Sequence, residues 1–220
     1  MNDDNRASTH YQVSVSTIEI TMPDGSPATA EVLYAALTDE NAEVGVSAAL
    51  GLAKLGDLSP VVTNTLFNAA DWRGDPEASS AARHGITTLA QTDPVVIDRL
   101  LTALQENKEW LSGVAECLGE IGQATPAVID GLLTFSQRSD DAYAVVSALH
   151  SLVQLGYATD TIIQQLLARY KQGDMIVRSV ALRALGLLQA PPPEVISLLL
   201  AAAQRKANPF TRCSRTPAHH

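Results

Sequence analysis

The chain has 220 residues, of which 46% are hydrophobic and 5% aromatic, and its formal net charge is −9. The apolar fraction excludes a disordered chain, and two cysteines are too few for a disulfide scaffold or a cysteine-rich zinc site. No apolar run reaches the roughly 18 residues of a membrane span, and the polar, acidic start is not that of a signal peptide. We therefore expect a cytoplasmic protein without membrane contact.

Three segments are predicted along the chain. Residues 1–25 are expected to be an extended or disordered lead-in, because residues 11–20 are rich in Val, Ile, Ser and Thr, which favour extended backbone. A repeat domain is predicted at residues 26–206. Residues 207–220, with two prolines and two terminal histidines, are predicted to form a disordered tail.

Dipeptides that favour the start of a helix recur at intervals of 33, 34, 32, 34 and 33 residues. Five of the six begin with Ser, Thr or Asp, which cap the free N–H groups of a first turn, and five end in proline, which suits the first helical position. An amphipathic run follows each of them, with apolar residues one, three and four positions apart, and predicts a helix that we name helix B. The second residues of the dipeptides are Pro27, Pro60, Pro94, Pro126, Asp160 and Pro193.

A second helix, helix A, is predicted to precede each of the last five. Its caps are Asn41, Asp75, Asn107, Asp141 and Asp174. Two apolar slots hold Ala48, Ala82, Val114, Ala148 and Ala181, and Leu52, Ile86, Leu118, Leu152 and Leu185; a third holds Leu55, Leu89, Ile121, Leu155 and Leu188. A slot of small residues, which lets a neighbouring helix approach closely, holds Gly51, Gly85, Cys117, Ser151 and Ala184. Left-handed glycines at Gly56, Gly122 and Gly156 are expected to end three of these helices.

Neither helix can bury its apolar stripe alone, so the units must stack on one another. This predicts an all-α fold, an α-solenoid of about five to six helical hairpins. It also accounts for the many small apolar residues and few aromatic ones, because thin layers need close contacts rather than large side chains.

Two segments, VRSVALRALGLL (177–188) and LSGVAECLGEIGQATPAVIDGLL (111–133), resemble HEAT-like repeats. They are similar to the short units of phycobilisome lyase-type proteins and to the arrays that follow bacterial NACHT ATPase domains. The resemblance covers about residues 27–205 and implies a non-catalytic scaffold for a protein partner, such as a module of a larger regulatory protein. It leaves open a lyase-like factor that acts on a bilin chromophore or its carrier protein. The ankyrin and tetratricopeptide patterns are missing.

The sequence predicts no catalytic residue, metal site or cofactor. His84 and His150 stand in the same slot of helix A, about 20 Å apart in a stack, and are therefore too distant to share a metal. We interpret the slot as outward-facing and solvated, because its other members are unlike: Leu50, Glu116 and Arg183. Cys117 is expected to be an inert core thiol.

The predicted functional site is a surface. With the apolar stripe of helix B inward, the opposite face is expected on the concave side of the solenoid, with a floor of small residues and polar walls. Such a groove fits an extended peptide or a partner helix; the alternative is a solvated face without a ligand. The predicted partner-binding residues are Asn64, Asp98, Arg99, Asp130, Gln164 and Gln165.

The two ends of the chain differ in charge. Residues 1–168 hold 7 Lys+Arg and 22 Asp+Glu, whereas residues 169–220 hold 8 and 2. The basic end is suited to an acidic partner or to head-to-tail pairing with a second copy; nucleic acid is a weaker alternative, because the patch is short and lacks aromatic residues.

In the last helix B, Leu198, Leu199 and Leu200 form an apolar triplet where a terminal repeat needs a polar face, so this end is expected to dock on something.

Overall fold

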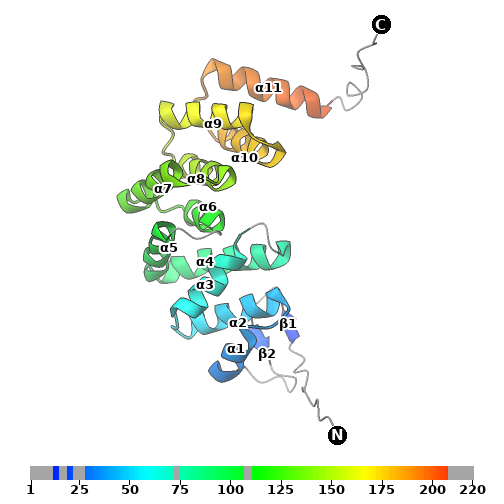
Figure 1. The fold of residues 1–220 in the computed structure, drawn as a ribbon, viewed down its shortest axis with the longest axis vertical. Helices are drawn as coiled ribbons and strands as arrows, with labels where there is room; N and C mark the ends of the chain where they lie inside the picture. Colours follow the sequence, from blue (N-terminus) through cyan, green and yellow to red (C-terminus); the bar gives the residue numbers. More distant parts are fainter. Residues whose placement is uncertain (1–11, 15–18, 22–27, 72–74, 107–110, 208–220) are drawn as a thin grey trace.

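The computed structural model describes residues 12–14, 19–21, 28–71, 75–106 and 111–207. In this part the helices stack in chain order along one long axis (Figure 1). They are α1 (Ala30–Ala36), α2 (Ala42–Lys54), α3 (Pro60–Ala69), α4 (Pro76–Thr92), α5 (Val95–Gln105), α6 (Leu111–Ile121), α7 (Pro126–Arg138), α8 (Ala142–Gln154), α9 (Asp160–Gln172), α10 (Met175–Gly186) and α11 (Pro193–Ala207). The fold is all-α apart from a small antiparallel hairpin, β1 (Gln12–Ser14) and β2 (Glu19–Thr21).

The predicted helix starts are confirmed where the structure describes them. Helices α3, α5, α7, α9 and α11 begin within one residue of the predicted helix B positions. The carboxylates of Asp75, Asp141 and Asp174 each accept hydrogen bonds from two N–H groups of the following helix, as N-caps do. Ser59 differs, because its side chain makes no capping bond. The dipeptide at residues 26–27 and the cap at residue 107 lie outside the described residues.

Three helices of the A type end as predicted. Gly56, Gly122 and Gly156 have φ angles of 88°, 75° and 81°. An L-residue with a side chain rarely adopts this left-handed backbone, which ends the helix and turns the chain toward the next one.

The β-hairpin lies against α2 at the N-terminal end of the stack (Figure 1). The expectation of extended backbone in residues 11–20 is confirmed for Gln12–Ser14 and for the part of β2 that falls in this range. The repeat period would place a helix A here, so the hairpin covers α2 where a preceding unit would otherwise pack. The boundaries of the lead-in, repeat domain and tail stay predictions.

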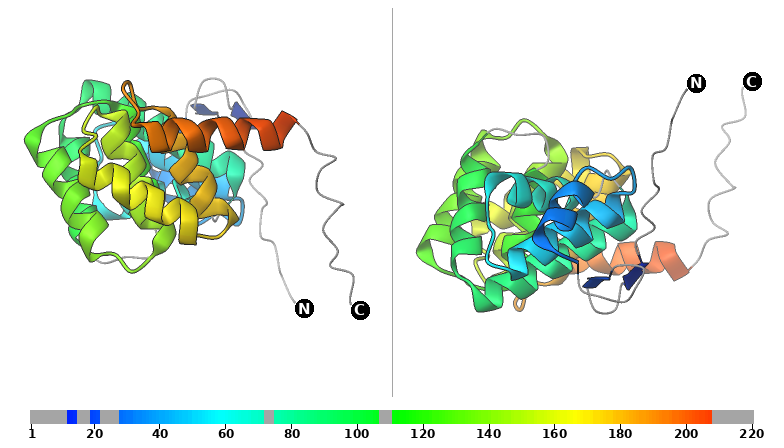
Figure 2. Two further views of the ribbon diagram at one scale, coloured as in Figure 1. Left: turned by 90° about the horizontal axis from the view of Figure 1, so that it is seen from above. Right: turned by 90° about the horizontal axis from the view of Figure 1, so that it is seen from below.

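The helices form two rows that differ in spacing. The even-numbered helices pack on one another in an unbroken series from α2 to α10, and each also contacts odd-numbered neighbours. Among the odd-numbered helices of the described part, only α5 and α7 pack extensively on each other. Views from the two ends show the layers superimposed along the axis, with α11 lying across the last one (Figure 2).

The even-numbered row is nearly solid. Every residue from Leu111 to Gly119 of α6 is buried, and the first two apolar slots of helix A are at most 1% exposed throughout. A Cβ atom on Gly119 would lie 2.6 Å from Ser151 Oγ of α8, and one on Gly85 would lie 2.3 Å from Leu50 Cδ2 of α2. The small-residue positions therefore set how closely these helices approach, as the sequence predicted.

The third predicted apolar slot lies at the edge of the core. Leu55, at the C-terminal end of α2 directly before Gly56, is 66% exposed, and the other four members of the slot are half-buried. These positions lie in or just after the last turn of each helix, where fewer neighbours cover them. Within the described residues, no helix is long and apolar enough to cross a membrane.

Candidate functional site

The predicted partner-binding residues lie on one face of the odd-numbered helices. Asn64 is on α3, Asp98 and Arg99 on α5, Asp130 on α7, and Gln164 and Gln165 on α9. All are exposed except Asn64, which is half-buried. The prediction that this face is the concave one stays a prediction.

A hollow of about 310 Å³ opens on this face between α5 and α7, and Asp130 lies in its wall. Its apolar lining includes Leu101 and Leu104 of α5 and Phe135 of α7. The remaining lining residues are Gln105, Ala127, Gly131, Thr134 and Arg138. The other five predicted binding residues lie outside the hollow, so only Asp130 of the predicted set belongs to a formed cavity.

Gly131 explains why the hollow is here. At the corresponding position, five residues after the helix B start, α5 has Arg99 and α9 has Gln165. A Cβ atom on Gly131 would lie 2.9 Å from Leu101 Cδ2, so the glycine faces α5 directly. At one end of the hollow, Arg138 Nη2 donates a hydrogen bond of 2.6 Å to the carbonyl oxygen of Leu104, in the last turn of α5. This contact ties the two helices together beside the opening.

The lining is suited to holding an apolar side chain. Apolar carbon from Leu101, Leu104 and Phe135 is joined by one carboxylate and one guanidinium, the combination that fixes an apolar side chain and orients a polar group beside it.

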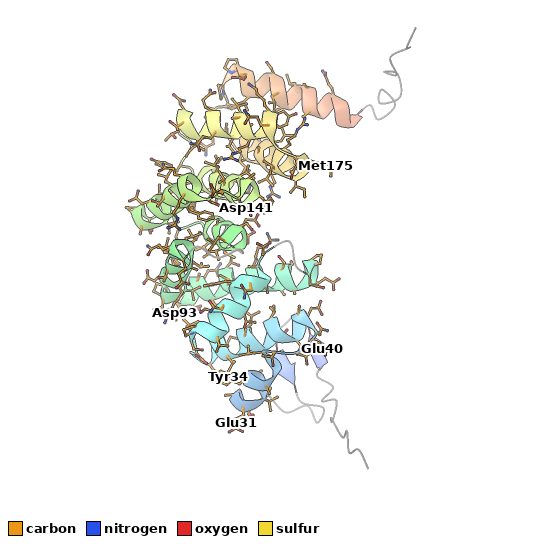
Figure 3. The ribbon with its side chains drawn as sticks, viewed as in Figure 1. Glu31, Tyr34, Glu40, Asp93, Asp141 and Met175 are labelled. Atoms are coloured by element: carbon orange, nitrogen blue, oxygen red, sulfur yellow. The ribbon has the colours of Figure 1, made fainter. Side chains whose placement is uncertain are left out.

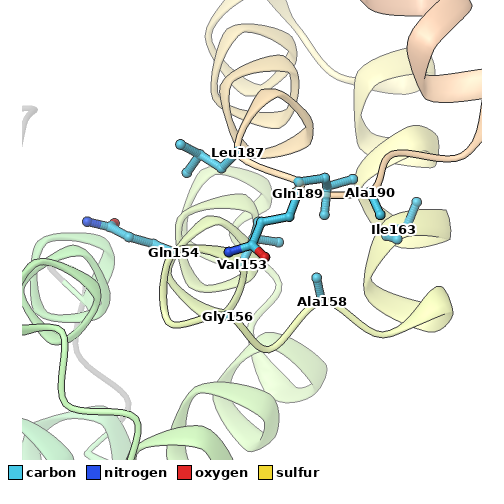
Figure 4. Close-up of a pocket in the computed structure, with 9 residues that line it drawn as sticks. Val153, Gln154, Gly156, Ala158, Ile163, Leu187, Gln189 and Ala190 are labelled. Carbon is cyan, nitrogen blue, oxygen red and sulfur yellow. The ribbon is translucent and has the colours of Figure 1, made fainter.

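A second hollow, of about 360 Å³, lies between the α8–α9 turn and the segment that joins α10 to α11 (Figure 4). Its walls include Val153, Ile163 and Leu187, with Gln154 and Gln189 as polar groups. None of its lining side chains is ionisable. It therefore offers no charge with which to select a partner.

The even-numbered row holds a polar cluster that the sequence did not reveal. Glu116 of α6 is 6% exposed, and its Oε2 lies 2.6 Å from Nη1 of Arg83 on α4. Its Oε1 accepts hydrogen bonds from the Tyr143 hydroxyl (2.9 Å) and the Ser147 hydroxyl (3.0 Å), both on α8. Burial and the negative charge of Glu116 raise the pKa of Tyr143. Since every oxygen of this carboxylate is engaged, the cluster holds three helices together.

The interpretation of the histidine slot as outward-facing was wrong for three of its five members. Leu50 is 2% exposed, Glu116 is buried and His150 is half-buried, whereas His84 and Arg183 are exposed. Burial and the nearby positive charge of Arg183 lower the pKa of His150 to about 4. The reason is the close approach of the even-numbered helices, which covers positions that a solvent-facing helix would expose.

Two further groups have a structural explanation. Cys117 is fully buried, as predicted, and burial raises the pKa of its thiol, which keeps it protonated and unreactive. Carboxylate oxygens of Glu43, Asp75 and Glu77 lie within 4.8 Å of one another near the start of α4. Asp75 caps α4 there, and Glu77 and Glu43 lie in the first turns of α4 and α2, where negative charge is favourable.

No protein-family model matches this chain. A search of curated proteins finds no match either. The resemblance to HEAT-like repeats, and with it the bilin-related alternative, therefore stays a prediction.

Proposed function

We propose that the chain is a HEAT-like α-solenoid that acts as a non-catalytic scaffold and binds a protein partner through the exposed face of α3, α5, α7 and α9. The regular recurrence of caps, glycine stops and small-residue contacts supports the repeat assignment. The stack of helices in chain order is compatible with it (Figure 1).

The observation that carries the proposed function is the hollow between α5 and α7. It falls on the face selected from the sequence, and its wall includes Asp130. The partner that fits has an apolar side chain that enters between Leu101 and Phe135, with a basic group beside it that faces Asp130. A helix or an extended segment can present such a pair.

Comparative capture from the source cell tests this proposal. We expect a partner to be retained by the wild-type chain and lost with Gly131→Leu, which fills the hollow, and with Asp130→Lys, which reverses the charge. Glu40→Lys is the matched control, because it makes the same charge change at an exposed site between α1 and α2.

Circular dichroism must show unchanged helicity in all three variants. The proposal fails if no protein is captured, or if the proteins captured by Gly131→Leu and Asp130→Lys are the same as those captured by the control.

A further inference from the structure

The hollow between α5 and α7 is bordered by two charges of opposite sign, both carried by α7. Asp130 and Arg138 are eight residues apart, which is about 12 Å along a helix, and they lie on one stripe with Thr134. Apolar carbon of Leu101 and Phe135 forms part of the same lining. The opening therefore presents a negative group, an apolar surface and a positive group.

Neither charge is neutralised within the fold. In the part of the chain that the structure describes, Asp130 and Arg138 form no ion pair, and both side chains are exposed. Asp141, which follows Arg138 by three residues and is labelled in Figure 3, is engaged as the cap of α8. Its carboxylate accepts hydrogen bonds from the N–H groups of Tyr143 and Ala144. Both charges at the hollow are therefore available to a partner.

The guanidinium of Arg138 is held in position without a partner. It donates its hydrogen bond to the carbonyl oxygen of Leu104, which lies in the last turn of α5, where carbonyl groups have no acceptor role within their own helix. A guanidinium has five N–H groups, so others remain for a carboxylate of a ligand. Because the side chain is already ordered, this binding costs less conformational entropy.

The features of the hollow coincide in one helix. Twelve residues after the helix B start, α5 has Glu106 and α9 has Gln172, whereas α7 has Arg138. An acid four residues after the start recurs in α5, as Asp98, but without a glycine beside it. Among these three helices, α7 alone combines the acid with Gly131 and the arginine.

We propose that the partner segment is extended and presents a basic, an apolar and an acidic side chain on one face, which contact Asp130, the apolar lining and Arg138. This inference rests on the proposed function, because it names the partner chemistry of the same hollow. Side chains two residues apart in an extended segment point to the same side, and four residues span about 13 Å, which matches the separation of the charges. A helix is about 10 Å wide, too broad to enter a hollow of about 310 Å³.

Selection from a phage-displayed library of random peptides tests the inference, because it needs no identified partner. The full wild-type chain is the bait, after removal of peptides that bind Gly131→Leu, in which the hollow is filled. We expect the remaining peptides to share Lys or Arg, a large apolar residue, and Asp or Glu, each two positions after the previous one.

A charge swap tests the role of Arg138. An Arg138→Glu bait should select Lys or Arg where the wild-type chain selects an acid. Arg183→Glu is the matched control, since it makes the same charge change at an exposed site of α10, and it should select the wild-type motif.

Fluorescence anisotropy with a selected peptide gives the size of the effect. Arg138→Glu should weaken binding about three- to tenfold, and replacement of the acid of the peptide by lysine should restore it. If Arg138 only tied α7 to α5, its replacement would weaken the binding of both peptides alike.

Three results would overturn the inference: no enrichment beyond the Gly131→Leu bait, a shared motif without an acidic residue, or the same motif on the wild-type and Arg138→Glu baits. If capture from the source cell still depends on Gly131 and Asp130, the proposed function stands and only this partner chemistry is wrong.

Discussion

The two rows of helices are built from one repeating sequence pattern but have different properties. The even-numbered helices approach so closely that glycine is required at their contacts and a carboxylate is enclosed among them. The odd-numbered helices pack less on one another, and where α5 and α7 do meet, beside Gly131, a hollow remains on their face. Close packing therefore characterises the even-numbered row, whereas the odd-numbered row carries the hollow at which we propose that a partner binds.

Removal of the Glu116 carboxylate should reduce the stability of the even-numbered row more than any other change considered. Glu116→Ala removes a buried acceptor that buried Ser147 and half-buried Arg83 and Tyr143 share, which we expect to cost about 2–4 kcal/mol of unfolding free energy. Urea unfolding, followed by circular dichroism, measures this cost.

Glu120→Ala is the control for the same helix. The Glu120 carboxylate lies 3.9 Å from Arg83 and its side chain is 40% exposed, so its loss should cost less than about 1 kcal/mol. Equal losses of unfolding free energy for Glu116→Ala and Glu120→Ala would contradict a stabilising role of the buried cluster.

The same substitution at two glycines should have opposite signs in the two rows. Gly119→Ala places a methyl group against Ser151 of α8 and should destabilise the fold by about 1–3 kcal/mol. In the odd-numbered row, the methyl group of Gly131→Ala meets only the movable end of the Leu101 side chain. The higher helix propensity of alanine should therefore dominate and stabilise the fold by up to about 1 kcal/mol. Thermal unfolding of both variants decides this, and destabilisation of similar size would contradict the difference in spacing.

Acidification should lower the unfolding free energy of the chain through His150, which lies in the even-numbered row. The pKa of His150 is about 4 in the folded chain, below the value of 6.5 for a free histidine. The unfolded chain thus takes up a proton first, and stability falls as the pH is lowered from 6.5 to 4, by about 2 kcal/mol or less. His150→Gln should remove this part of the pH dependence, which urea unfolding at pH 7 and pH 4.5 can measure. An identical pH dependence in the variant would show that other groups cause it.

The regular part of the fold could be read from the sequence because it depends on local chemistry. Caps such as Asp75 and glycine stops such as Gly56 act within one turn of helix, so their spacing alone predicts where helices begin and end. The placement of Asp130 on an exposed face follows from helical periodicity for the same reason.

The features that the sequence did not predict depend on distances between helices, which periodicity does not encode. Glu116 looks solvent-facing in the sequence because its slot also holds His84 and Arg183, and its burial results from contact with α8. The hollow was missed because it depends on how α5 and α7 pack around Gly131, which the sequence does not encode. A glycine within an otherwise regular helix B was the available signal.

The carboxylate of Glu116 also has a consequence for how the chain opens. From α6 it bonds to α4 on one side and to α8 on the other, so a single carboxylate links three successive units. Units linked in this way lose their bonds together, so the middle of the chain should open as one cooperative block. Fluctuations that open single units should then concentrate toward the two ends of the stack. At the C-terminal end, one face of α11 is uncovered.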